Sequence, residues 1–299
     1  FYDLREYDEA LFKFKQALET HIKLGDQVGI AIDHGDIGMT YAHQKRIEKA
    51  LKHYDKAISI FEKEGKQAHR ALFLTMLAGV HYQSGNFNKA IEIYKTANEI
   101  EVEIGNKSRV ALNLAFIGLV YSSMQLHEDS IKYRTQAIDI YETLENENQL
   151  AILYVTIGDN YNLLSKFDTA LSFYKKALPI NKIRGDDIWL AANLSSMSSM
   201  QNIIGNYKDA LLNVEAALTI NRKIGKKISI ELNLAVLGSA HVGLRNFVQS
   251  TEAYNEALKI SKERGDGNAT AGYLSSIALN HEYLNKHDKA MEFHESSLK

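Results

Sequence analysis

Eleven histidines give this sequence of 299 residues many potential metal ligands and general bases, although it contains no cysteine. A zinc-binding helix carries two histidines four residues apart with a glutamate after the first, because that spacing puts both rings on one face. His-Glu pairs begin at His127, His281 and His294, and none has a second histidine three residues after its glutamate. We therefore expect no metal site.

Motifs for phosphate binding and nucleophilic catalysis are incomplete in the same way. The Gly-Lys pairs that begin at Gly65 and Gly225 lack the glycine five residues earlier that a phosphate-binding loop requires. The serines clustered within residues 195–199 have no partner base at a recognisable offset. We predict that the chain is not an enzyme, has no catalytic residue and uses no cofactor.

A period of 40 residues organises the whole sequence. One position of the repeat holds only alanine or serine, at Ala10, Ala50, Ala90, Ser130, Ala170, Ala210, Ser250 and Ala290. A second position, beginning at Gly38 and Ala78, is also always small, as close packing of two helices requires. Glycine recurs at Gly25, Gly65, Gly105, Gly185, Gly225 and Gly265, and only Glu145 interrupts this series. Such periodicity is typical of a solenoid or a propeller.

Two kinds of segment alternate within each period. Residues 46–63 place apolar side chains three and four apart among charged ones, which indicates an amphipathic helix. Residues 109–124 carry one charge and residues 189–204 carry none before Gly205, so these helices must be covered on more than one side. Glycine followed by aspartate, as at Gly185-Asp186 and Gly265-Asp266, predicts a helix end and the next helix start. The absence of strand-type alternation excludes the propeller.

Composition narrows the class of partner. The formal net charge is −2, from 35 basic and 37 acidic residues, and no basic stripe suggests nucleic-acid binding. No apolar run approaches the roughly 20 residues of a membrane helix, so we expect no membrane partner and a cytoplasmic protein. Phe1 and Lys299 both fall inside a repeat, which predicts that residues 1–299 form a single repeat domain truncated at both ends.

The spacing of packing residues that recurs along the chain resembles that of a known family. Leu114, Gly118 and Tyr121, followed by Ser130 and Ala137, match the pattern of the tetratricopeptide repeat. The 40-residue unit is similar to the long repeats of kinesin light chains, Leu-Gly-Asn repeat adaptors and bacterial Rap-type receptors. The resemblance implies an all-α fold: an α-solenoid, wound as a right-handed superhelix of about seven antiparallel hairpins.

The resemblance also implies that the first helix of each hairpin lines a concave groove for a peptide. By helical phase, the groove positions include Asp36, Thr75, Met76, Tyr82, Phe116, Leu119, Ser123, Thr156, Asp159, Asn162, Ser196, Ser199, Asn202 and Ser239. None of them is lysine or arginine, which disfavours a groove that captures a terminal carboxylate. We expect Asn162 and Asn202 to bond a peptide backbone and Phe116 or Met76 to supply apolar contacts.

Three functions follow as hypotheses. The first is a protein- or peptide-binding scaffold, the sensory or adaptor part of a larger regulatory or signalling protein. The second is an architectural module that self-associates or spaces attached domains through its helical ends. The third, an enzyme, has no supporting motif.

Overall fold

The computed structural model describes residues 4–298, in which helices are joined by short turns and there is no strand. The prediction of an all-α fold is therefore confirmed. The predictions based on Phe1 and Lys299 concern residues outside this range. The helices are α1 (Leu4–Leu24), α2 (Gln27–His43), α3 (Ile47–Lys63), α4 (Gln67–Gln83), α5 (Phe87–Glu103), α6 (Lys107–Ser123), α7 (His127–Thr143), α8 (Glu147–Leu163), α9 (Phe167–Arg184), α10 (Asp187–Ile203), α11 (Tyr207–Ile224), α12 (Lys227–Gly243), α13 (Phe247–Arg264), α14 (Gly267–Tyr283) and α15 (His287–Ser297).

Seven antiparallel hairpins, from α2/α3 to α14/α15, follow α1 and confirm the 40-residue repeat. The small residues lie where the two helices of a hairpin come closest. A Cβ on Gly118 of α6 would lie 3.1 Å from the Ser130 carbonyl oxygen of α7. Ala50, Ala90 and Ala170, at the same position as Ser130, are fully buried. A larger side chain at either position would push the helices apart, which explains the composition of the repeat.

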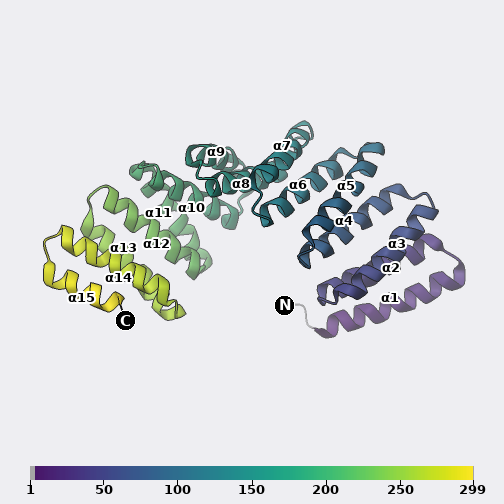
Figure 1. Cartoon of the computed structure of the whole chain (residues 1–299), viewed down its shortest axis with the longest axis horizontal. Helices are drawn as coiled ribbons and strands as arrows, with labels where there is room; N and C mark the ends of the chain where they lie inside the picture. Colours follow the sequence, from purple (N-terminus) through teal and green to yellow (C-terminus); the bar gives the residue numbers. More distant parts are fainter. Residues whose placement is uncertain (1–3, 299) are drawn as a thin grey trace. The chain divides into compact units, whose positions relative to one another are not determined.

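The chain divides into two compact units, residues 1–146 and residues 147–299. Within each unit, consecutive helices lie side by side (Figure 1). Apolar side chains from successive hairpins join in one core, which includes Ile37, Phe61 and Ile117 in the first unit. A single hairpin has no second layer to bury this surface, so stacking supplies the core. The single-domain organisation of residues 1–299 stays a prediction.

The joints between hairpins confirm the glycine and aspartate signals. Gly185 and Gly265 end α9 and α13 in the left-handed conformation, with φ of 65° and 72°. Asp186 and Asp266 then accept hydrogen bonds from the first backbone N–H groups of α10 and α14. These contacts satisfy backbone donors that a helix start leaves free.

No helix within residues 4–298 has the length and apolar character needed to cross a membrane.

Side chains twelve residues apart pack across some of these joints. His21 Nδ1 of α1 lies 2.6 Å from Asp33 Oδ2 of α2, and this hydrogen bond raises the pKa of His21. One repeat later, the rings of Phe61 and Phe73 pack with their centroids 5.1 Å apart. The same two positions are thus filled once by an ion pair and once by two aromatic rings.

Glu145 occupies the position that is glycine at six other joints, and its φ is also positive, at 51°. A side chain in this region costs about 1 kcal/mol, because its Cβ crowds the following carbonyl oxygen. We expect Glu145→Gly to raise the free energy of unfolding by about 0.5–1 kcal/mol, measured by urea denaturation. Gly105→Glu, at the same position one repeat earlier and with φ of 75°, should lower it by a similar amount. Changes of the same sign in both variants would contradict this account of the joint.

Candidate functional site

All the residues predicted to line the groove lie on first helices of the hairpins. Asp36 is on α2, and the others lie on α4, α6, α8, α10 and α12. Within each unit, a first helix contacts its own hairpin partner and, where one precedes it in the same unit, the preceding second helix.

In residues 1–146, Tyr82 and Ser123 are brought together from α4 and α6. Their hydroxyl oxygens lie 3.0 Å apart, and both side chains reach solvent. Phe116 is half-buried and stacks on Tyr94 with the ring centroids 5.4 Å apart. Leu119 is exposed on the same helix. These residues could offer a guest hydroxyl groups beside an apolar surface.

The other predicted residues of this unit are less accessible. Thr75 is buried, and its hydroxyl donates to Asn113 Oδ1 of the next first helix at 2.9 Å, so it joins two repeats. Met76 is half-buried against the core. Asp36 is also half-buried, and burial, assisted by the negative charge of Asp33, raises its pKa.

In residues 147–299, a pocket of about 260 Å³ lies between α8, α10 and α12. Four predicted residues line it: Asp159, Asn162, Ser196 and Ser199. Ile188, Ala192, Leu232 and Val236 contribute apolar surface to the same wall. Ile188 and Leu232 are exposed, so a guest in the pocket would cover apolar area that water now contacts. We call this site the unit 2 pocket.

Asp159 is held by a tyrosine of the second helix α9. The Tyr174 hydroxyl donates to Asp159 Oδ1 at 2.7 Å. Burial, reinforced by the negative charge of Asp159, raises the pKa of Tyr174, so its hydroxyl keeps the proton that it donates. Gly158 makes room for the ring, since a Cβ there would lie 2.6 Å from it. The pairing fixes one oxygen of the Asp159 carboxylate, which is exposed at the surface of the pocket.

Two further predicted residues, which are not among those that line the pocket, meet between α10 and α12. Asn202 Nδ2 of α10 donates to Ser239 Oγ of α12 at 2.9 Å. The Asn202 Oδ1 atom is buried and has no hydrogen-bond partner. A buried amide oxygen without a donor costs about 1–3 kcal/mol, so a guest N–H placed there would be stabilised. Thr156, on α8, is half-buried and donates to the Leu153 carbonyl oxygen at 3.1 Å.

Helical phase did not predict several polar residues of the unit 2 pocket, three of which carry amide or ammonium groups. Asn221, Lys226 and Asn233 come from the end of α11, the joint that follows and the buried side of α12. Asn233 is only 2% exposed, and its Nδ2 donor has no partner. Asn113 and Asn193 occupy the same position in two earlier repeats, and both are also buried. Lys226 adds a cation to a wall that the first helices alone would leave without one.

The serines of the pocket are bonded to the helix backbone. Ser195 Oγ donates to the Ala191 carbonyl oxygen at 2.7 Å, and Ser199 Oγ donates to that of Ser195 at 3.0 Å. Their hydroxyl protons are therefore directed into the helix rather than toward a base, which is not the arrangement of a serine nucleophile. The site is suited to recognition through amide, hydroxyl and carboxylate groups.

Comparison with the sequence profiles of known families agrees with the repeated helical hairpins seen in the structure. Residues 1–63, 30–100 and 108–183 each match the sequence profile of the tetratricopeptide repeat, and together these matches cover more than half of the chain. The chain belongs to the tetratricopeptide repeat family. No curated protein matches it over its sequence.

Solved structures share this tetratricopeptide repeat fold at low sequence identity. A STAND signal transduction ATPase with a tetratricopeptide repeat sensor, from Pyrococcus horikoshii, is 14% identical with a TM-score of 0.75 over 95% of this chain and 44% of that one. RapI in its apo form is 15% identical, with a TM-score of 0.72 over 97% and 85%. A Rap protein complexed with Competence and Sporulation Factor is 17% identical, with a TM-score of 0.53 over 91% and 74%. At this level of identity, the similarity establishes the fold alone.

Proposed function

We propose that this tetratricopeptide repeat chain is a non-catalytic scaffold that binds a peptide segment of a partner protein in the unit 2 pocket. The observation that carries the proposal is a pair of buried amide groups without partners. Asn233 Nδ2 lies in the wall of the pocket, and Asn202 Oδ1 lies on α10, three residues after Ser199 of that wall. One is an acceptor and the other a donor. A peptide backbone presents N–H and C=O groups in alternation and could satisfy both.

The apolar part of the wall supports the same class of ligand. Ile188 and Leu232 would pack on side chains of the peptide, while Asp159 and Lys226 would select charged groups at its ends or along it. The occurrence of this fold in a sensor region of a STAND protein, and in a Rap protein bound to a factor, is consistent with such a role. We extend the proposal to a cytoplasmic sensory or adaptor region of a larger regulatory protein.

The test begins with peptides selected from a random 12-residue display library by the full chain. Calorimetry would then compare the chain with Asn162→Ala and Asn202→Ala, and we expect each variant to bind the selected peptide about tenfold more weakly. Asn255→Ala serves as the control, because Asn255 is exposed on α13. Unfolding midpoints should stay within a few degrees. Unchanged affinity in both groove variants would refute binding at this site.

Sedimentation velocity separates this function from the architectural alternative. A scaffold that binds peptides should remain in the same oligomeric state at every protein concentration when no peptide is present. A module that acts by self-association should instead form dimers as its concentration rises, whether or not a peptide is added.

A further inference from the structure

Two glutamates are almost completely buried, and they differ in the hydrogen-bond and ion-pair partners of their carboxylates. Glu101 near the end of α5 is 1% exposed, and Glu231 on α12 is 2% exposed. Charged side chains are rarely buried to this extent unless they are paired. At the position of Glu101, other repeats carry uncharged or weakly basic residues: His21, Phe61, Tyr141, Asn181, Asn221 and Ser261.

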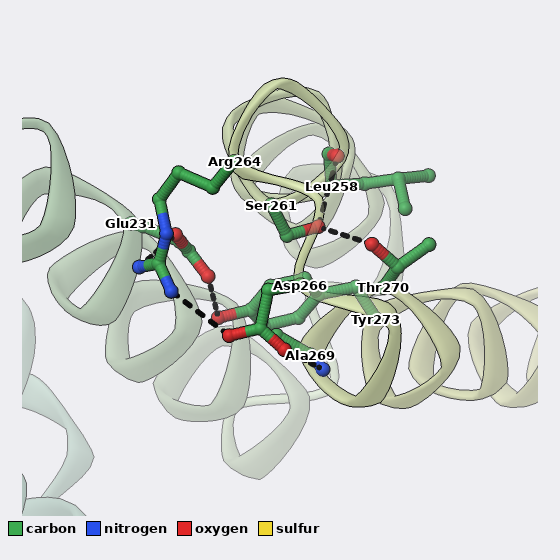
Figure 2. A network of polar contacts seen from close by, with 8 residues as sticks. All are labelled: Glu231, Leu258, Ser261, Arg264, Asp266, Ala269, Thr270 and Tyr273. Carbon is green, nitrogen blue, oxygen red and sulfur yellow. Dashed lines mark hydrogen bonds and ion pairs between the residues drawn. The ribbon is translucent and has the colours of Figure 1, made fainter.

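Glu231 receives two hydrogen bonds from within its own unit. Arg264 Nη1 donates to Oε2 at 3.0 Å, and the Tyr273 hydroxyl donates to Oε1 at 3.2 Å. Figure 2 shows the Glu231 carboxylate between the guanidinium group and the phenol. The Tyr273 pKa is raised to about 12, first by burial and then by the negative charge of Glu231. This is how the chain itself stabilises a buried carboxylate.

Glu101 has no comparable partners. Both of its carboxylate oxygens are buried, and neither accepts a hydrogen bond of good geometry, although the Asn106 side chain is near enough to act on the pKa of Glu101. The cation that approaches it is Arg109 of α6, whose Nε lies 3.9 Å from Oε1, too far for a hydrogen bond. Burial raises the pKa of Glu101 despite the opposing effects of Arg109 and Asn106. A donor placed against this carboxylate would therefore relieve a cost that the free chain now bears.

A pocket of about 450 Å³ opens at this glutamate, between the ends of α5 and α7 and the start of α6. Its wall is mainly apolar, with Val102, Val110 and Ile140, and Val102 is 59% exposed. Asp139 adds a second acidic group, and Lys107 lies at the exposed edge. The pocket includes the ends of second helices, so it is distinct from the first-helix face of the predicted groove. Its size is within the range of pockets that hold small organic groups.

We propose that this pocket binds a guanidinium group on an apolar stem, such as the arginine side chain of a partner. The planar N–H groups of a guanidinium match the two oxygens of a carboxylate, which a single ammonium group does not. The guest would give Glu101 what Arg264 gives Glu231, while Val102 and Ile140 contact the stem. Arg109, whose side chain is 37% exposed, turns into solvent when the guest enters.

The chemistry is tested with small probes on the full chain. Butylguanidinium should bind at millimolar concentration, measured by chemical-shift perturbation of the Glu101, Val102 and Ile140 amides. Butylurea, which has a similar shape but no charge, should cause no such shifts. Equal shifts from both probes, or no shifts from either, would overturn the proposal. A blocked Leu-Arg-Leu peptide distinguishes the two sources of the guanidinium group. Tighter binding of the peptide than of butylguanidinium would indicate a protein partner, and equal affinity would indicate a free guanidine compound. Either result supports recognition of a guanidinium group by Glu101.

Variants identify the carboxylate responsible. Glu101→Asn introduces the residue found at this position in Asn181 and Asn221, so the fold should be retained, as checked by the unfolding midpoint. It should weaken butylguanidinium binding about tenfold or more. Arg109→Ala should strengthen binding, because it removes the internal competitor. Undiminished affinity in Glu101→Asn would refute the site. Because the unit 2 pocket is formed by residues 159–236, which do not include Glu101 or Arg109, peptide binding there should be unaffected.

Discussion

Arg264→Ala should lower the stability of residues 147–299 by about 3 kcal/mol. The reason is that Glu231 is almost completely buried and would lose its ion pair with Arg264 while remaining out of water. Removing one partner of a buried pair typically costs about 3–5 kcal/mol, and we take the lower value because Arg264 is 31% exposed. Amide hydrogen exchange in α12, α13 and α14 measures the change locally, so it does not require the whole chain to unfold in one step.

The double variant Glu231→Ala/Arg264→Ala distinguishes an unpaired charge from a simple loss of packing. Alanine fills the position of Glu231 in the other repeats, as at Ala71 and Ala191, where it is buried. We expect the double variant to regain at least half of the lost stability. Arg222→Ala, which breaks an exposed pair with Glu256, should cost less than about 1 kcal/mol. A double variant as unstable as Arg264→Ala would show that the charge is not the cause.

Gly35→Ala should destabilise residues 1–146 by about 2–3 kcal/mol. A Cβ on Gly35 would lie 1.7 Å from Phe73 Cε1, and that ring is buried against Phe61 and Tyr54. Overpacking of this kind costs about 1–3 kcal/mol, and the overlap here is severe. Alanine is better than glycine in a helix by about 1 kcal/mol, but this gain is smaller than the expected cost. Urea denaturation would measure the difference.

Gly272→Ala provides the matched control on α14. Gly272 is exposed and a Cβ there would meet nothing within 4 Å, so only the helix preference of alanine acts. This variant should be more stable by about 0.5–1 kcal/mol. In the first unit, adding Phe73→Leu to Gly35→Ala should recover part of the loss by removing the ring. Equal stabilisation by both glycine replacements would contradict the predicted clash.

The fold could be predicted because the same packing problem recurs every 40 residues. Two helices that approach closely need small side chains at their contact. Ala90 and Ala170 are such residues, and both are fully buried. Glycine at φ > 0 and a capping aspartate mark the joints directly in the sequence. These signals are local, so they can be recognised in the sequence without knowledge of the tertiary structure.

The site could be predicted only in part, because pockets combine elements that are far apart in the sequence. Helical phase predicted one face for Asn162 and Ser199, and both line the unit 2 pocket, but it could not show that Thr75 turns toward Asn113. Lys226 reaches the unit 2 pocket from a joint, which has no helical phase. Glu101 looks like any other charge on a second helix, and only comparison with Asn181 and Asn221 hints at its burial.

The paired side chains across the joints have a consequence for folding fidelity. A chain of near-identical hairpins could dock one hairpin in the place of another, 40 residues away, and still bury small residues against small residues. Such a displacement would set Phe61 against Asp33 or His21 against Phe73, leaving a carboxylate or an imidazole facing an aromatic ring. Because these contacts differ from joint to joint, they favour docking of each hairpin against its correct neighbour. A hairpin that is exchanged by engineering should therefore be moved together with the residues that contact it across the joint.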